Sequence, residues 1–334
     1  MAEPLVVAEG LVKQFPVHGG VLQREVATVN AVAGVNLTIH RGETVGLVGE
    51  SGCGKSTLGR TLVRLLEPTS GTITFDGENI THLKGKKLKP FRKRAQFVFQ
   101  DPFASLDPRT QVGNSISEGL RLHGVTNKDE RQVRVNEMLD LVGLQPSHAG
   151  RYPHEFSGGQ RQRIGLARAL ILKPEFVVAD EPVSALDVSV QAQVLNLFKE
   201  LQSELNLTLL FVAHNLAVVE HMSDRVAVMY LGRIVEIAER NRIYEHPLHP
   251  YTEALLSAIP MPDPDRPRNR QILQGEVPSP INPPAGCYFH PRCPIMEKGV
   301  CDVDVPELLA GDDMPTHLAA CHMRTGTHPK RPVG

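Results

Sequence analysis

A glycine-rich segment with one lysine is the first part of this sequence that could carry chemistry. It reads Gly49-Glu-Ser-Gly-Cys-Gly-Lys-Ser56 and fits the pattern G-x-x-x-x-G-K-[ST], between an apolar strand expected at 43–48 and a helix expected after it. Such a backbone curls so that its N–H groups face phosphates, while Lys55 supplies a cation and Ser56 can bind magnesium. A plain glycine-rich turn is the alternative, but motif and context agree. The expected phosphate contacts are Gly49, Ser51, Gly52, Cys53, Gly54, Lys55, Ser56 and Thr57.

Two adjacent carboxylates, Asp180 and Glu181, follow the apolar run Phe176-Val-Val-Ala179. If this run is a strand of a parallel sheet, both carboxylates lie at its carboxyl end, where ligands bind in open α/β sheets. Asp180 could then hold magnesium, directly or through water, and Glu181 could orient an attacking water. A strand that ends in two acidic residues is common on its own. Downstream of a phosphate-binding loop, it indicates a nucleoside triphosphatase.

A second cluster of small residues, Ser157-Gly-Gly-Gln160, precedes a helix expected at 160–172. Serine and glycines at a helix start can form another set of anion-binding amides, which a single-site triphosphatase does not need. One interpretation is a second phosphate contact, made by Ser157, Gly158, Gly159 and Gln160. The alternative is a simple helix cap with Ser157 at the N-cap position.

In their order along the chain, the three motifs resemble those of the ABC ATPases, whose Ser-Gly-Gly-Gln signature lies between the two nucleotide motifs. The resemblance covers roughly residues 5–240 and implies roles for four more residues. Gln100 resembles the Q-loop glutamine, which contacts the magnesium region and relays to a transmembrane partner. Asp187 lies in the D-loop at the dimer interface, His214 matches the switch histidine at the γ-phosphate, and Phe15 is the candidate for adenine stacking. The structural alternatives are a polar strand end, a helix cap, a structural histidine and a core aromatic residue.

The resemblance also implies that two such domains meet head to tail, so that ATP on the phosphate loop of one is capped by the signature of the other. Glu181 would then act as general base or water-positioner, with Lys55, Gln100 and His214 completing the catalytic set. The implied magnesium contacts are Ser56, Gln100 and Asp180.

Four longer strings narrow the resemblance to the bacterial dipeptide and oligopeptide importer ATPases of the DppF or OppF type. They are residues 100–109, 152–156, 249–252 and 276–284. In that family two different ATPase subunits drive two membrane permease subunits fed by a solute-binding protein. The resemblance therefore implies a paralogous ATPase partner, a heterodimer, and a peripheral position on the cytoplasmic face of the bacterial inner or cell membrane. Importers of nickel and other small solutes use similar ATPases, so the solute stays open.

Four of the five cysteines lie near the C-terminus, at Cys287, Cys293, Cys301 and Cys321, with the spacing C-x5-C-x7-C-x19-C. Four thiolates can hold a [4Fe–4S] cluster or a tetrahedral zinc ion. Some peptide-importer ATPases are similar in carrying an iron–sulfur cluster in this extension, so iron is preferred to zinc. Four free thiols are the third possibility.

Composition excludes several other classes of protein. The chain has 334 residues, 41% hydrophobic and 22% charged, which is typical of globular proteins and favours two structural units. A net charge of −1 gives no basic excess for nucleic acid, and no apolar run approaches the roughly 18 residues of a membrane span. A cytosolic protein is expected. A soluble ABC ATPase acting on nucleic acid or ribosomes, and a non-hydrolysing binding module, are the rival classes.

The elements that must position these residues alternate between strands and helices, which predicts a parallel sheet covered on both faces. Strands are expected at 95–100, 209–213 and 226–230, a hairpin at 71–80, and short β-rich runs before residue 48 with turns at Gly19-Gly20 and Gly34. The expected fold is α/β: a P-loop NTPase (RecA-like) core with an antiparallel β subdomain and a helical signature subdomain at about 102–170. We expect the nucleotide-binding domain to span 1–240 and a loop-rich, proline- and cysteine-rich extension to span 241–334. Val133, Met138, Leu141 and Leu144 are expected to share one apolar helix face, and Val190, Val194, Leu197, Leu201 and Leu205 another.

Overall fold

The computed structural model describes residues 3–19, 24–101, 105–259, 273–311 and 314–325. Its backbone divides into two compact units. The first unit comprises Met1–Leu5, Ile39–Thr44 and Thr74–Val212. The second unit comprises Val6–Thr38, Val45–Ile73 and Ala213–Gly334.

The core of the first unit is a parallel sheet in the order β8 (Thr208–Val212), β7 (Phe176–Asp180), β6 (Ala95–Val98). Phe176 pairs with Ala95 on one side and with Thr208 on the other. Every residue of β7 and β8 is buried, as expected for Val- and Leu-rich strands covered on both faces. Because the strands are parallel, their carboxyl ends share one edge of the sheet.

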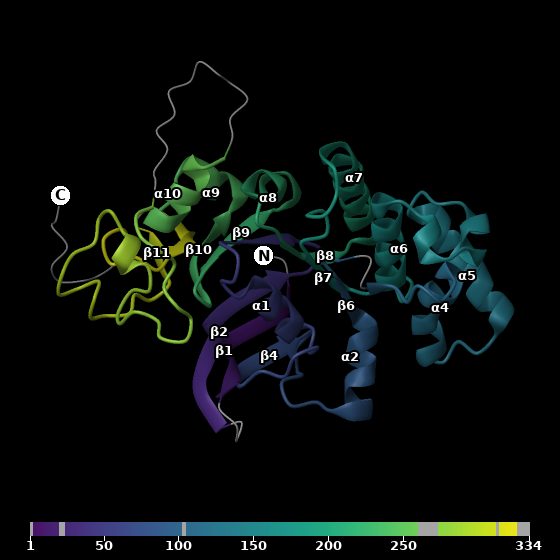
Figure 1. Ribbon diagram of the computed structural model, residues 1–334, viewed down its shortest axis with the longest axis horizontal. Coiled ribbons are helices and arrows are strands. Elements are labelled where there is room, and N and C mark those ends of the chain that lie inside the picture. The colour runs from purple at the N-terminus through teal and green to yellow at the C-terminus, as the bar shows by residue number, and fades with distance from the viewer. Residues whose placement is uncertain (1–2, 20–23, 102–104, 260–272, 312–313, 326–334) are drawn as a thin grey trace, which may run out of the picture. The chain divides into compact units, whose positions relative to one another are not determined.

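Helices surround this sheet and form a cluster beyond it (Figure 1). Helices α4, α5 and α6 pack on one another, and α6 also packs against α7. The helices of this unit are α2 (Lys89–Arg94), α4 (Val112–Leu122), α5 (Lys128–Leu141), α6 (Gly158–Leu170) and α7 (Val188–Leu205), with 3-10 turns at Gly85–Leu88, Pro146–Gly150 and Pro153–Glu155.

Two predicted apolar faces are corrected in detail. Of the predicted apolar face, Met138 and Leu144 are buried and Leu141 is half-buried, whereas Val133 is 55% exposed. Val135 and Leu139, which were not in the predicted face, are buried on α5 instead. On α7 the middle of the predicted stripe is buried, at Val194, Leu197 and Leu201. Its last member, Leu205, is 37% exposed.

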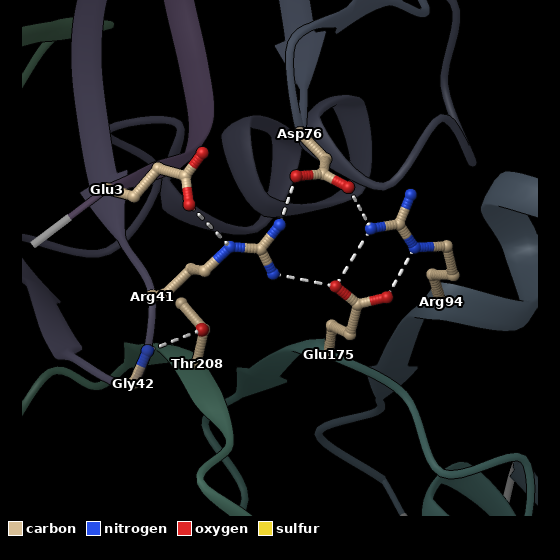
Figure 2. Close-up of polar contacts among 7 residues, drawn as sticks. All are labelled: Glu3, Arg41, Gly42, Asp76, Arg94, Glu175 and Thr208. Carbon is tan, nitrogen blue, oxygen red and sulfur yellow. Dashed lines mark hydrogen bonds and ion pairs between the residues drawn. The ribbon is translucent and has the colours of Figure 1, made fainter.

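Four charged side chains form a closed ion-pair network in the first unit (Figure 2). Arg41 and Arg94 alternate with Asp76 and Glu175, and each arginine contacts both acids. Arg41 Nη1 and Arg94 Nη2 each lie 2.8 Å from Glu175 Oε2. Arg94 directly precedes β6 and Glu175 directly precedes β7, so the network ties together the amino ends of these strands. It lies at the opposite end of the strands from Asp180.

The second unit contains an antiparallel β region in the strand order β2 (Arg24–His40), β1 (Pro4–Gly19), β4 (Ser70–Phe75). The end of β4 forms the predicted hairpin with β5 (Glu78–Asn79). Short strands with a turn at Gly34 were expected, but Gly34 lies inside the long strand β2 with a φ of 79°. A glycine at positive φ is tolerated there without ending the strand. Gly20, at the other predicted turn, lies outside the described residues.

A second sheet of this unit has the order β11 (Leu309–Gly311), β12 (Met314–Ala319), β10 (Arg233–Glu239), β9 (Arg225–Tyr230), β3 (Thr44–Val48). Strand β3 runs parallel to β9, and the other pairs are antiparallel. The extension was expected to be loop-rich, yet it supplies β11 and β12. Sequence alone missed these strands because both are short, β12 pairs with β10 about 80 positions away, as Ala319 does with Glu236, and β11 pairs with β12.

A buried acid holds the extension to this sheet. Glu236 has no solvent exposure, and its carboxylate accepts hydrogen bonds from the amides of Leu248 (2.7 Å) and His249 (2.9 Å). The Nε2 atom of His317, on β12, lies 2.7 Å from the same carboxylate. The helices of this unit are α1 (Lys55–Leu62), α8 (Leu216–Met222), α9 (Arg240–Glu245) and α10 (Pro250–Ser257), with a 3-10 turn at His290–Arg292.

The proline-rich segment is only partly described: Pro260, Pro262, Pro264 and Pro267 lie outside the described residues. None of the helices in the described part of the chain is both long and apolar enough to cross a membrane.

Candidate active site

The phosphate loop follows β3 and leads into α1, in the strand–loop–helix context that the motif requires. Two of its glycines lie so close to neighbouring backbone carbonyl groups that a side chain would not fit. A Cβ atom on Gly49 would lie 2.1 Å from the carbonyl oxygen of Met229, and one on Gly54 would lie 2.0 Å from that of Ala31. Gly52 adopts a φ of 79°, which favours glycine. Only glycine therefore fits at these positions of the loop.

Lys55, the first residue of α1, turns back beneath the loop. Its Nζ atom donates to the carbonyl oxygens of Gly49 (2.8 Å) and Glu50 (3.0 Å), and the residue is 5% exposed. Burial raises the pKa of the neighbouring Cys53 thiol, so this thiol stays protonated beside the ammonium. Ser56 and Thr57 occupy the first turn of α1, where the amides at a helix N-terminus favour anions. The loop therefore combines amides, a buried cation and hydroxyl groups.

At the carboxyl end of β7, the structure brings together two of the predicted catalytic residues. Asp180 is fully buried as the last residue of the strand, and Glu181 follows it. Gln100 Nε2 donates to Glu181 Oε2 at 3.2 Å. The strand predicted at 95–100 ends at Val98, so Gln100 lies just beyond β6 and reaches across to the neighbouring strand tip. This contact was not predicted from the sequence.

The signature residues begin helix α6 with a capping box. Ser157 Oγ accepts from the amide of Gln160 at 3.3 Å, and Gln160 Oε1 accepts from the amide of Ser157 at 3.0 Å. The helix-cap alternative for Ser157 is therefore confirmed. A Cβ atom on Gly159 would lie 2.4 Å from Cγ1 of Val190, so this glycine is needed where α6 passes the start of α7. A cap does not exclude a phosphate contact, because Gly158 and Gly159 occupy the first turn of the helix.

The remaining predicted residues lie in distinct local settings. Asp187 is exposed at the N-cap position of α7, but its side chain makes no capping hydrogen bond. His214 is exposed just after β8. Phe15 is half-buried on β1, with Lys13 Nζ 5.0 Å from its ring centroid, so it is not a core residue. The first unit thus carries Gln100, the signature, Asp180, Glu181 and Asp187, and the second carries Phe15, the phosphate loop and His214.

The four C-terminal cysteines are half-buried or buried and form no disulfide. Burial raises the pKa of Cys287 to about 11 and that of Cys293 to about 12, and Cys301 and Cys321 raise both further by their proximity. The Cys301 sulfur accepts a hydrogen bond from the backbone amide of Glu297 at 3.5 Å. The backbone amides of Phe289, Ile295 and Met323 partly oppose the effect of burial on the pKa of Cys287, Cys293 and Cys321.

The predicted metal site is not present as a formed ligand set. No three His, Cys, Asp or Glu side chains among the described residues, which include all four of these cysteines, lie close enough together to hold a metal ion. Spacing along a sequence can suggest that thiols lie near one another, but it does not fix the distances between their sulfur atoms.

Sequence reasoning missed one set of contacts to the phosphate loop. The amide of Glu50 donates to Tyr251 Oη at 2.8 Å, and the Glu50 carboxylate is bound by Arg292. Tyr251 lies in the string His249-Pro-Tyr-Thr252, to which sequence analysis assigned no role. This motif was the sequence signal that could have pointed to the contact with the phosphate loop.

Known protein families match both parts of the chain. Residues 32–184 match the family described as ABC transporter, and residues 235–301 match the oligopeptide/dipeptide transporter C-terminal region. The chain is 54% identical over 324 residues to the oligopeptide transport ATP-binding protein AppF of Bacillus subtilis (strain 168), covering 96% of this chain and 98% of that protein. It is also 54% identical over 318 residues to a putative peptide import ATP-binding protein of Brucella ovis, covering 95% and 97%.

Solved structures of ABC ATPases resemble this chain in fold. The ATP-binding cassette MJ0796, in a dimeric post-hydrolysis state bound to ADP and Pi, superposes with a TM-score of 0.63 at 29% identity, covering 71% of this chain and 99% of that one. CbiO1 of Clostridium perfringens, part of an ABC transporter complex, gives 0.62 at 28% identity, covering 73% and 92%. The predicted P-loop NTPase fold is thereby confirmed. Together with the phosphate loop and the carboxylates at the tip of β7, these matches show that the chain belongs to the family of ABC transporter ATPases that carry the oligopeptide/dipeptide transporter C-terminal region.

Proposed function

We propose that this ATPase powers the import of dipeptides or oligopeptides through a membrane permease. The observation that carries the proposal is identity over nearly the whole chain to proteins named for oligopeptide transport and peptide import, including the C-terminal region. A nickel or other small-solute importer would share the cassette, but that region is described for oligopeptide and dipeptide transporters.

The phosphate loop would bind the triphosphate of ATP through its amides. Lys55 would release its contacts with the loop carbonyls to neutralise the β- and γ-phosphates, and Phe15 would stack on adenine through its half-buried ring. The remaining loop contacts would be Gly49, Ser51, Gly52, Cys53, Gly54, Ser56 and Thr57.

Hydrolysis would be centred on Glu181. Its carboxylate would accept a proton from the attacking water, and the hydrogen bond from Gln100 would hold it in position. His214 would contact the γ-phosphate. The oxygen ligands of Ser56, Gln100 and Asp180 suit magnesium, which would neutralise charge on the phosphate oxygens when bound.

The signature at Ser157–Gln160 would cap ATP held by a partner ATPase subunit, with Asp187 at the interface between them. The dimeric state of MJ0796 supports such an arrangement. We propose a paralogous subunit as the partner, with two permease subunits and a solute-binding protein completing the importer. The chain would act at the cytoplasmic face of a bacterial membrane and would not bind nucleic acid. Residues 1–240 would form the nucleotide-binding domain, with its helical part at about 102–170, and 241–334 the extension.

The transport proposal is tested with the complete importer reconstituted in lipid vesicles. ATP hydrolysis should rise when the solute-binding protein is added with a mixture of short peptides, and peptide should accumulate inside the vesicles. Stimulation by nickel but not by peptide would identify a metal importer instead. Association of the purified chain with nucleic acid or ribosomes, without a permease, would contradict the proposal.

We further propose that Cys287, Cys293, Cys301 and Cys321 hold a metal centre, with [4Fe–4S] preferred to zinc. The support is that the four thiols lie near enough to affect one another's pKa and that backbone amides lie near their sulfurs, as at Glu297 and Cys301, an arrangement that can stabilise metal-bound thiolates. Their sulfurs do not have ligand spacing, so binding would draw them closer.

Absorbance decides between the three possibilities for the thiols. Protein purified without oxygen should show a broad band at about 400 nm, as expected for a cluster with cysteine ligands, and the band should be lost in Cys293→Ser. A colourless protein containing one zinc ion would reverse the preference for iron. A metal-free protein with four reactive thiols would contradict the proposed centre.

A further inference from the structure

The second residue of the phosphate loop, Glu50, is held by the C-terminal extension. Arg292 binds its carboxylate with two parallel hydrogen bonds, Nη1 to Oε2 at 2.9 Å and Nη2 to Oε1 at 3.1 Å. The amide of Glu50 donates to Tyr251 Oη at 2.8 Å. All of these residues belong to the second unit. The extension therefore contacts both the backbone and the side chain of one loop residue.

These contacts converge on the part of the loop that positions Lys55. The carbonyl oxygen of Glu50 accepts from Lys55 Nζ at 3.0 Å, and that of Gly49 does so at 2.8 Å. Three groups of Glu50 are thus fixed at once: its amide by Tyr251, its carboxylate by Arg292 and its carbonyl by the lysine. A shift of Glu50 would move the loop amides and the lysine contacts together, because they belong to one tight turn.

The arginine is buried and rigidly supported. Its side chain is 7% exposed, and that of Glu50 is 26% exposed. A cluster of aromatic rings made of Tyr230, Tyr251 and Phe289 supports this pair, with ring centroids 4.7 to 5.5 Å apart. Bidentate arginine–carboxylate contacts are among the strongest polar contacts in proteins, and partial burial strengthens them by reducing screening.

We propose that Arg292 is a positioning residue for ATP binding, acting through Glu50 on the phosphate loop. The inference rests on the ATPase activity of the chain and deepens it, since it gives the C-terminal extension a direct part in nucleotide affinity. Arg292 itself does not touch the nucleotide. Its effect is on the shape of the loop that binds phosphates in both the ground state and the transition state, so it acts mainly on the KM for ATP.

Arg292→Met in the full-length chain tests the proposal, because methionine keeps much of the apolar packing and removes both hydrogen bonds to Glu50, together with the longer one to Tyr230 Oη at 3.5 Å. The KM for magnesium–ATP should rise about tenfold, the change expected from losing a charge-assisted contact, with a much smaller change in kcat. Arg292→Lys keeps the charge but cannot donate two parallel hydrogen bonds, so its KM should lie between those of wild type and Arg292→Met. Thermal unfolding midpoints measured in parallel should stay close to wild type.

Arg324→Met is the matched control. Arg324 also lies in the extension and pairs with Glu253 at 3.0 Å, away from the loop, so its loss should leave KM unchanged. If Arg292→Met folds poorly, Glu50→Gln removes the same ion pair from the other side and should raise KM similarly. A KM equal to wild type in both Arg292→Met and Glu50→Gln would overturn the proposal, as would an equal rise in Arg324→Met. Wild-type protein without ATPase activity would instead overturn the function on which the proposal rests.

Discussion

At the scale of single residues, the backbone of Glu181 is the most unusual feature of the candidate active site. Its φ is 45°, a left-handed conformation that costs about 1 kcal/mol or more for a residue with a side chain. Neighbouring groups hold it there: its amide donates to the carbonyl oxygen of Val212 at 2.9 Å, and its carbonyl accepts from Ser184 Oγ at 3.0 Å. The strained turn aims the carboxylate away from the end of β7 and toward Gln100.

Replacing Glu181 with glutamine should lower the ATP turnover number at least about a hundredfold, because the amide cannot accept a proton from water. ATP binding should survive, so a stable ATP-bound dimer should accumulate and appear as a larger species in gel filtration with magnesium–ATP. Glu200→Gln, an exposed acid on α7, is the matched control and should hydrolyse ATP at the wild-type rate. Wild-type turnover in Glu181→Gln would refute the assignment.

A second residue-scale prediction separates the cap role of Ser157 from a phosphate role. Ser157→Ala should cost about 1 kcal/mol of helix stability through loss of the cap, whereas Ser157→Gly should cost only a few tenths. If Ser157 also contacts the partner's ATP, both variants should lose most ATPase activity. Activity that falls only in the alanine variant, in step with the free energy of unfolding, would leave the serine as a cap alone.

Motif chemistry identified these residues as candidates, but it did not predict their contacts. Residue types at fixed spacing indicated Lys55, Asp180 and Glu181, because phosphate binding and water activation need those groups. The bond from Gln100 to Glu181 and the positive φ of Glu181 depend on how two strand ends meet. Sequence patterns within one strand do not specify how its end is arranged relative to the end of a neighbouring strand.

At the scale of elements, the ion-pair network fastens the amino ends of two strands whose carboxyl ends carry the catalytic residues. Hydrogen bonds from Arg94, followed by those from Arg41, lower the pKa of Asp76 and of Glu175. A carboxylate with a lowered pKa in the folded state stabilises the fold above its unfolded pKa, near 4, and loses that contribution as the pH falls below it. The network should therefore stabilise the first unit at neutral pH and not in acid.

Glu175→Gln tests this dependence. At pH 7 the variant should be less stable than wild type by about 1 kcal/mol, a modest value because the network is about one-third exposed. The difference should shrink as the pH is lowered from 5 to 3, measured as the midpoint of urea unfolding. Glu118→Gln, which removes an exposed contact 3.9 Å from Arg121 and a longer-range interaction with Arg168, should show a much smaller trend. A constant difference across this pH range would contradict the predicted linkage.

Element prediction was accurate where local patterns are strong. The buried strands β7 and β8 and the helix α7 were predicted from apolar runs and helical spacing. The apolar face predicted around α5 was right at Met138 and Leu144 and wrong at Val133, since Val133 and Val135 are equally apolar and only packing against α4 and α6 distinguishes them. Strand β12 was missed because it pairs with β10, which is distant in the sequence, and β10 was missed although it forms a local hairpin with β9.

At the scale of the whole molecule, the composition shift near residue 240 marks a change in sequence character but not a break in structure. The second unit includes the phosphate loop together with the extension, and Glu236, Tyr251 and Arg292 connect them. The sequence resemblance predicted the cassette and its relatives, whereas this connection required the structure.

The buried carboxylate of Glu236 has a consequence for any shortened form of the protein. A stop codon after residue 240 would remove every donor that the structure places on this acid, and it would strip β10 of its neighbour β12. An unpaired strand edge beside an unsolvated negative charge promotes self-association, so the shortened protein should accumulate in inclusion bodies. A natural cassette that ends at this point would need a different residue in place of the acid.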